Sequence, residues 1–261
     1  MRSENFTAGQ SVRRLVSVVP GDLPIILTAP HGGGNAIDGV PKRQGNGVGM
    51  FKAMSDAFTD QLTEKLADAI EKQTGKRPYT VIARFHRKYL DANRRAQDAY
   101  ESPNAAPIHD YYHQAIVEAK KSVTDRWGRG LLIDIHGQAK EPKAIFRGTQ
   151  NGKTTKHLVK RFGVEALQGK ASLFGQLAAA GFPVIPDVGS TDLEHSAYDG
   201  GYTVVTHGSL SGGTIDAIQL ELGRHLRVPG ANIKTADQLA KAIIAFSEKY
   251  LPAFDQLKRN R

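Results

Sequence analysis

Short apolar segments alternate with amphipathic segments along most of this 261-residue sequence. An apolar run at 25–28 ends in Pro30-His31-Gly32-Gly33-Gly34, which is typical of a buried strand that runs into a glycine loop. Apolar residues then recur three or four positions apart from 51 to 70, which predicts an amphipathic helix that ends at Gly75. This alternation predicts a three-layer α/β fold with a mixed, mostly parallel sheet.

The remaining segments continue the same pattern. Leu131 to Ile135 is apolar enough to be a central strand covered on both faces. Further strands are predicted at 80–85, 144–147, 184–186, 202–206 and 217–221, and further helices at 108–123, at 173–180 and from Thr235, where Gln238 completes a capping box. Because no repeat, low-complexity tract or polar linker interrupts the chain, we expect a single domain over residues 1–261.

The amino-acid composition excludes several kinds of functional site and partner. The absence of cysteine excludes disulfides, cysteine-ligated zinc, iron–sulfur clusters and a cysteine nucleophile. The net charge of +9 favours anionic partners, but no dense basic block with interleaved aromatics favours nucleic acid. No segment approaches the roughly 18 apolar residues of a membrane span, and the first residues do not resemble a secretory leader. We therefore expect no membrane partner and take the cytoplasm as the default location.

Polar residues gather where the predicted strands end. His31 follows the first strand, Asp91 follows the second, and Asp134 and His136 close the third, while Glu221 ends the strand at 217–221. In α/β folds the carboxyl ends of parallel strands form the ligand-binding edge of the sheet. Neutral imidazoles with a carboxylate and an open position make a catalytic zinc site, and a nearby carboxylate can accept a proton from water.

Each of these residues also has an ordinary structural explanation. A histidine after a strand is often a hydrogen-bonding residue, and Asp91 is equally explained by an ion pair with Arg94. Asp134 shares a strand face with His136, so it is either a partner behind a metal ligand or a buried hydrogen-bonded acid. The joint placement of histidines and acids at successive strand ends favours a functional site.

Five ordered motifs strengthen this interpretation. They are Ala29-Pro30-His31-Gly32-Gly33, Leu90-Asp91-Ala92-Asn93-Arg94, Ile133-Asp134-Ile135-His136-Gly137, Gly200-Gly201-Tyr202 with Thr206-His207-Gly208, and Ile218-Gln219-Leu220-Glu221. Together they resemble the N-formylglutamate amidohydrolase family, a branch of the zinc carboxypeptidase and aspartoacylase group. The resemblance extends from about Ile25 to Arg227, most of the chain.

The resemblance implies a phosphorylase/hydrolase-like α/β fold with one Zn²⁺ per chain, and it matches His31 and His136 to the histidine ligands. In the carboxypeptidases a Glu stands three positions after the first histidine, where this sequence has Gly34. The formylglutamate branch instead has an Asp at the head of the following helix, which Asp56 matches. An exposed helix acid is the alternative explanation of Asp56, and the other candidates for the middle ligand are Asp38 and His86.

The resemblance also implies roles around the metal. Glu221 matches the general base, and Asn93 with Arg94 occupies the place where the wider group holds a substrate carboxylate, although the usual Asp-Leu-Asn-Arg reads Asp-Ala-Asn-Arg here. A guanidinium suits this task because it donates two parallel hydrogen bonds to one carboxylate. Arg147 is a second basic candidate, for substrate or for an acid of the protein. Tyr202 is a candidate for substrate contacts, whereas His207 is better explained as structural.

The sequence thus predicts a zinc amidohydrolase that cleaves a C–N amide bond of a small anionic N-acyl amino acid or of a short acidic peptide. A metal carboxypeptidase and a cell-wall amidase of the same fold are alternatives. A non-catalytic basic scaffold for anionic ligands is another alternative, which would not need to retain His31, His136 and Glu221. A serine hydrolase is disfavoured because the chain has no Gly-x-Ser-x-Gly motif. The sequence predicts no oligomeric state.

Overall fold

The computed structural model describes residues 8–49 and 51–252. Within this part of the chain, seven strands form one sheet in the order β1-β3-β2-β4-β7-β5-β6. Their bounds are Val16–Val19 (β1), Ile25–Ala29 (β2), Tyr79–Ala83 (β3), Gly130–Gln138 (β4), Ile145–Gly148 (β5), Val184–Ile185 (β6) and Ile215–Gly223 (β7). The neighbours β3, β2, β4 and β7 are parallel, whereas β1 and β5 run antiparallel to β3 and β7. The predicted mixed, mostly parallel sheet is confirmed.

The central strands are buried on both faces, because helices cover both faces of the sheet. Every residue of β2, β3 and β7 is buried. The longest pairing joins β4 to β7, from Gly130 opposite Ile215 to Gln138 opposite Gly223. Because β2, β3, β4 and β7 run in one direction, the segments that follow them emerge at the same edge of the sheet.

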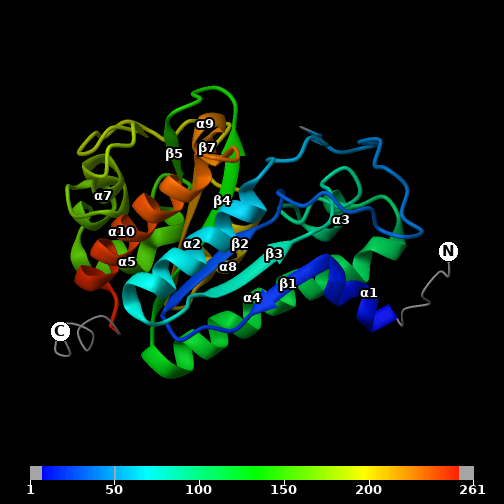
Figure 1. Ribbon diagram of the computed structural model, residues 1–261, viewed down its shortest axis with the longest axis horizontal. Coiled ribbons are helices and arrows are strands. Elements are labelled where there is room, and N and C mark those ends of the chain that lie inside the picture. The colour runs from blue at the N-terminus through cyan, green and yellow to red at the C-terminus, as the bar shows by residue number, and fades with distance from the viewer. Residues whose placement is uncertain (1–7, 50, 253–261) are drawn as a thin grey trace.

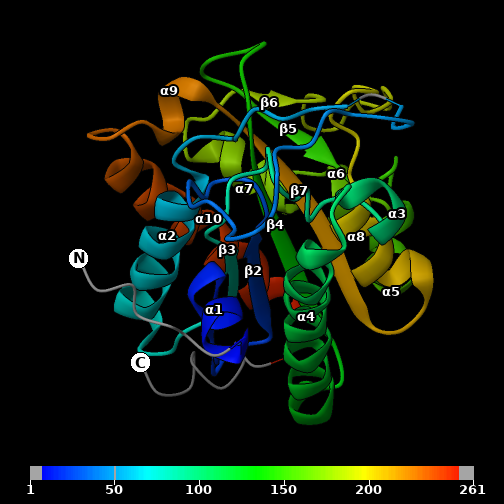
Figure 2. The same cartoon turned by 90° about the vertical axis from the view of Figure 1, so that its right-hand side faces the viewer.

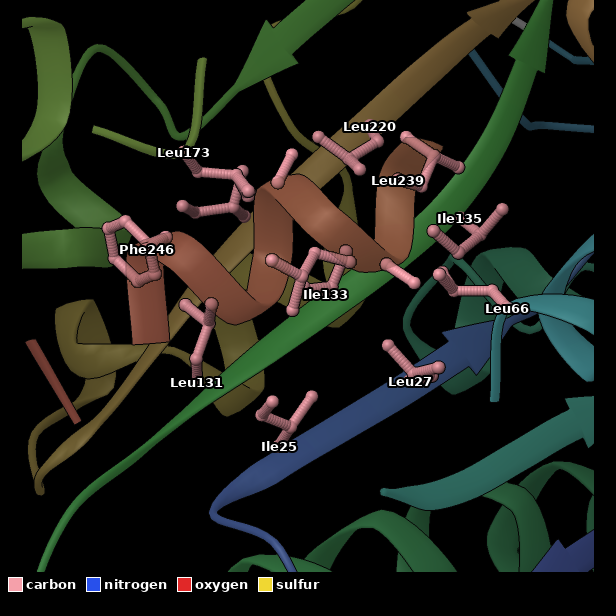
Figure 3. Close-up of a cluster of buried hydrophobic side chains, with 14 of the residues drawn as sticks. Ile25, Leu27, Leu66, Leu131, Ile133, Ile135, Leu173, Leu220, Leu239 and Phe246 are labelled. Atoms are coloured by element: carbon pink, nitrogen blue, oxygen red, sulfur yellow. The ribbon is translucent and has the colours of Figure 1, made fainter. Parts of the chain in front are cut away.

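Helices cover the two faces of the sheet (Figures 1 and 2). On one face lie α2 (Thr59–Thr74), α7 (Leu173–Ala179) and α10 (Asn232–Tyr250), and on the other lie α1 (Ala8–Leu15) and α4 (Ala106–Trp127). Side chains alternate between the faces with the period of two that a strand imposes. Leu131 and Ile133 pack against the α2 and α10 face (Figure 3), whereas Leu132 packs toward α4.

Shorter helices complete the fold around this frame. They are α3 (Ala96–Ala99), α5 (Lys156–Phe162), α6 (Glu165–Gln168), α8 (Tyr202–His207) and α9 (Arg224–Arg227), with 3₁₀ turns at Pro103–Ala105, Lys153–Thr155 and Ser209–Ser211. Within the described residues, no helix has both the length and the apolar character that crossing a bilayer requires.

Two predicted elements were wrong in ways that concern the site. The helix expected from 51 begins only at Thr59, because Phe58 adopts a left-handed backbone conformation with φ of 70° and separates the preceding loop from the helix. The strand expected at 202–206 is the helix α8. The β-branched run of that segment favours a strand, but Val204 is buried against the α4 face of the sheet, and this packing overrides local propensity.

The last helix also starts earlier than predicted. It begins at Asn232, and Thr235 is buried inside its first turn rather than capping it. The remaining predicted helices and strands overlap observed ones.

Candidate active site

A cleft of about 800 Å³ lies where the central strands end. His31 after β2, His136 in β4 and Glu221 in β7 line it. The loop before α2 contributes Asp56, and the segment after β3 contributes Asn93, so five separate parts of the chain meet in one cleft.

The base of the cleft holds a compact group of three buried side chains, His31, Asp56 and His136. One ligand atom from each lies within 4.8 Å of the others. The Asp56 Oδ2 atom is 3.3 Å from Nδ1 of His31 and 3.1 Å from Nδ1 of His136. The backbone holds Asp56 in this place, because its N–H donates to the His31 carbonyl oxygen (3.0 Å) and its Oδ2 accepts the N–H of Gly137 (3.2 Å).

A second carboxylate stands behind each histidine. Nε2–H of His31 donates to Oδ1 of Asp91 (2.7 Å), and Nε2–H of His136 donates to Oδ2 of Asp134 (2.8 Å). Thr28 fixes Asp134 by donating its hydroxyl to Oδ1 (2.6 Å). Each carboxylate therefore holds a proton on Nε2 of its ring, and Nδ1, the nitrogen that faces Asp56, is the atom available to a metal ion.

This geometry suits a divalent metal ion. Nδ1 of each ring and Oδ2 of Asp56 are held together either by protons on Nδ1, which Asp56 accepts as hydrogen bonds, or by a cation that replaces those protons. Burial raises the pKa of Asp56, but hydrogen bonds from His136 and His31 outweigh burial and hold this pKa well below its usual range, so Asp56 is ionised. Two imidazoles and one carboxylate, with room for a further ligand, form the donor set of catalytic zinc sites.

Asp91 accepts hydrogen bonds from several side chains and from the backbone of the segment that follows β3. Besides His31, it accepts from Nε and pairs with Nη2 of Arg87, both at 2.8 Å, and Oδ1 accepts the N–H of Asn93 (3.1 Å). Burial raises the pKa of Asp91, but His31 and Arg87 outweigh it and bring this pKa far below its usual range. Asp91 therefore links the histidine to the loop that carries Asn93 and Arg94. The ion pair with Arg94 considered from the sequence is also present, with Nε of Arg94 3.9 Å from Oδ2 of Asp91.

Glu221 in β7 lies directly beside His136 in β4, because the two residues are partners in the register of these adjacent strands. Its Oε1 accepts a hydrogen bond from Nε2 of Gln219 (2.9 Å), and the side chain faces the cleft. Burial raises the pKa of Glu221 to about 7, against the opposing positive charge of His136. A carboxylate with such a pKa can both accept and return a proton near neutral pH.

Asn93, Arg94 and Tyr202 also line the cleft. The Asn93 side chain is fixed, since its Oδ1 accepts the N–H of Thr203 (2.8 Å) at the start of α8. The Arg94 side chain is 33% exposed, so its guanidinium lies at the opening of the cleft rather than at its base.

Three other candidates lie elsewhere. Arg147 does not line the cleft: it is buried, and its Nε–H donates to Oε1 of Glu194 (2.7 Å). Asp38 is exposed beside a different cavity, and Nδ1 of His86 accepts the backbone N–H of Lys88 (3.0 Å). Of the three candidates for the middle ligand, only Asp56 lies with His31 and His136.

Sequence reasoning missed the two histidines that support the Asn93–Arg94 loop. They lie one turn apart on α4: Nε2–H of His109 donates to the Arg94 carbonyl oxygen (2.9 Å), and Nε2–H of His113 donates to that of Ala92 (3.0 Å). Their spacing of four on a predicted helix was the signal for a shared face. The ion pair of Arg87 with Asp91, four positions later, was also missed.

Comparisons with known proteins bear on the fold. No family model matches the sequence, and a search of curated proteins gives no significant match. Among solved structures, the N-formylglutamate amidohydrolase of Ralstonia eutropha JMP134 has a TM-score of 0.59 at 16% identity, over 94% of this chain and 99% of that one. A gene product of Agrobacterium tumefaciens has the same TM-score at 14% identity, over 90% and 96% of the two chains. The chain shares its fold with these structures, the first of which bears the name of the family that the motifs resemble.

Proposed function

We propose that this chain is a zinc-dependent amidohydrolase that cleaves a C–N amide bond of a small N-acyl amino acid, with an N-formylglutamate-like compound as the leading substrate. The observation that carries the proposal is the His31–Asp56–His136 group, with an acid behind each histidine and Glu221 beside it. The fold shared with an N-formylglutamate amidohydrolase supports it.

We propose that Nδ1 of His31, Nδ1 of His136 and Oδ2 of Asp56 hold the metal. A bound Zn²⁺ would supply a Lewis acid and lower the pKa of a water molecule to about 7. Asp91 and Asp134 orient the two rings and increase the basicity of Nδ1 by accepting hydrogen bonds from Nε2–H.

Glu221 is proposed as the general base. Its carboxylate accepts a proton from the attacking water as the new C–O bond forms at the amide carbon. When the C–N bond breaks, the same carboxyl group donates that proton to the departing nitrogen, which leaves as an amine. Burial of Glu221 keeps bulk water from competing for the proton.

Arg94 and Asn93 are proposed to hold a carboxylate of the substrate, and Tyr202 to contact its body. Lys52 and Arg94 add positive charge to the lining of the cleft, which suits an anionic substrate. The fixed Asn93 amide sets the position of the substrate, while the guanidinium of Arg94 supplies two parallel hydrogen bonds.

The test is hydrolysis of N-formyl, N-acetyl and N-succinyl derivatives of glutamate, aspartate and leucine by zinc-loaded protein, each also prepared with an amidated α-carboxylate. We expect turnover that a chelator abolishes and zinc restores, a higher KM for the amidated compounds, and a smaller amidation effect in Arg94→Ala. An N-acetylated dipeptide tests the peptidase alternatives. No hydrolysis of any compound by protein shown to contain zinc would contradict the proposed function.

A further inference from the structure

A buried arginine outside the predicted site contacts the three chain segments that carry Asp56, His136 and Glu221. Arg227 ends the short helix α9, which lies just beyond the end of β7 (Figure 1). It is 7% exposed, and part of it lines the cleft. A buried guanidinium is costly unless its N–H groups are hydrogen-bonded, so its partners show what it holds in place.

The three partners are backbone carbonyl oxygens from three distant segments. Nη1–H donates to Ala57, Nε–H donates to Leu222 (3.3 Å), and Nη2–H donates to Gln138 (3.4 Å). Ala57 directly follows Asp56, and Leu222 directly follows Glu221. Gln138 is two residues beyond His136.

The chain leaves space for this guanidinium at Gly137. A Cβ atom at Gly137 would lie 2.5 Å from Cζ of Arg227, closer than two carbon atoms can approach. Gly137 also donates its N–H to Oδ2 of Asp56. The glycine after His136 therefore serves two contacts at once, and any larger residue would displace the arginine.

We propose that Arg227 is a positioning residue for the hydrolase proposed above: by joining the segments at 57, 138 and 222, it fixes the distance between the metal ligands Asp56 and His136 and the base Glu221. This inference rests on the proposed function. Arg227 makes these contacts through the backbone, so its role is to set geometry rather than to touch the reacting atoms. The three nitrogens of the planar guanidinium each donate to a different carbonyl group, whereas the three donors of a lysine ammonium group radiate from one nitrogen and span a shorter distance.

The first test compares Arg227→Ala and Arg227→Lys with Arg224→Ala, a matched control because Arg224 is exposed on the same short helix. The Zn²⁺ dissociation constant is measured by competition with a chromophoric chelator, and kcat and KM are measured separately. We expect about 10–100-fold weaker zinc binding in Arg227→Ala, a fall in kcat larger than the change in KM, and only partial recovery in Arg227→Lys. Free guanidinium ion at non-denaturing concentration should raise kcat of Arg227→Ala alone.

Gly137→Ala approaches the same contact with the arginine intact, so it also serves if Arg227→Ala does not fold. We expect Gly137→Ala to weaken zinc binding and lower kcat, and the double variant with Arg227→Ala to be no worse than Arg227→Ala, because the space left by the guanidinium accepts the methyl group. Additive effects, or zinc binding and kcat in Arg227→Ala equal to those of Arg224→Ala, would overturn the proposal.

The same variants separate this inference from the proposed function. A parent protein that binds no zinc would overturn the proposed function and, with it, the positioning role. In that case the coupling between Gly137→Ala and Arg227→Ala in urea unfolding would still show whether the three segments are joined through Arg227.

Discussion

Two pairs of neighbouring histidines have different hydrogen-bond partners: His31 and His136 are both buried, whereas His113 is half-buried and packs on the buried His207. The rings of His31 and His136 are 4.8 Å apart and edge to face, and each donates Nε2–H to a carboxylate. The rings of His113 and His207 are stacked 5.3 Å apart, with Nδ1 of His113 3.0 Å from Nε2 of His207. Because Nε2–H of His113 donates to the Ala92 carbonyl oxygen, its Nδ1 must accept from Nε2–H of His207.

The acid partners decide what each pair can do. In the first pair the carboxylates accept hydrogen bonds from both Nε2–H groups, so both Nδ1 atoms face Asp56, where a cation can replace their protons. In the second pair His207 donates Nε2–H to the lone pair on Nδ1 of His113. His113 in turn donates to the Ala92 carbonyl oxygen, so the pair supports the Ala92–Arg94 loop. Burial lowers the pKa of His113 to about 4 and that of His207 to about 3, whereas Asp134 outweighs burial and raises the pKa of His136 well above its usual value. Histidine content alone therefore does not identify a metal site.

The largest expected effect comes from removing a ligand of the first pair. His136→Ala should lower kcat by at least about 10³-fold, because the Lewis acid contributes several kcal/mol and each 1.36 kcal/mol is a factor of ten. The measurement is turnover of the best substrate found above, at saturating zinc. Activity within tenfold of the parent would show that the first pair does not hold a catalytic metal.

Glu221→Gln should be nearly as damaging but should leave the metal in place. The amide cannot accept the proton of the attacking water, so we expect kcat to fall by about 10²–10⁴-fold with zinc content unchanged. Turnover and zinc are measured on the same preparation. Parental turnover in this variant would remove Glu221 from the role of base.

Removing an acid behind the first pair gives a smaller effect. Asp134→Asn should weaken zinc binding by about 10–100-fold, because the amide no longer draws the Nε2 proton of His136. The matched control is Asp110→Asn, since Asp110 is an exposed acid 3.6 Å from His109 beside the second pair. Equal zinc affinities of the two variants would contradict the importance of the acid partner.

Part of the fold could be predicted from the sequence pattern, and part of it could not. The apolar runs that become β2, β4 and β7 could be predicted as strands, because strands covered on both faces are rich in apolar residues. The alternation predicts the class of fold, a mostly parallel sheet between helices. It does not predict the order of the strands, because hydrophobic patterns do not show which strands are neighbours. The segment at 51–58 has helical spacing yet forms the loop that carries Asp56, because its conformation is set by the His31 backbone and by Phe58 rather than by periodicity.

Some residues of the candidate site could likewise be predicted from the sequence, and others could not. His31, His136 and Glu221 could be predicted because strand ends converge in parallel sheets. Asp56 required the family resemblance, since nothing local distinguishes it from an exposed helix acid. The role of Arg227 could not be predicted, because it depends on contacts across the fold: Arg227 bonds carbonyl groups of residues 170, 89 and 5 positions away. Arg87 pairs with Asp91 only four positions away, but the sequence does not show that Asp91 also holds His31.

The smallest expected effect concerns the second pair and pH. Because the pKa values of His113 and His207 are lower in the folded state than the usual 6.5, the unfolded chain binds more protons below pH 6.5, and stability falls as pH drops from 6.5 toward 4. The loss through this pair should be on the order of 1–3 kcal/mol, and His207→Gln should reduce it. The neighbouring charges are His109, Asp110 and Asp134 around His113, and Lys120 near His207.

Urea unfolding of the parent and of His207→Gln at pH 7 and pH 5 measures this difference. A fall in unfolding free energy of equal size in both proteins would show that the second pair does not titrate as described. Zinc content should be the same in both proteins at pH 7.

The most direct measurement is the zinc content of the purified parent, His136→Ala and His113→Ala by elemental mass spectrometry after incubation with zinc and removal of excess metal. The account predicts about one zinc ion per chain in the parent and in His113→Ala, and none above background in His136→Ala. Absence of zinc from the parent, or equal zinc in all three proteins, would contradict the claim that His31, Asp56 and His136 form the metal site.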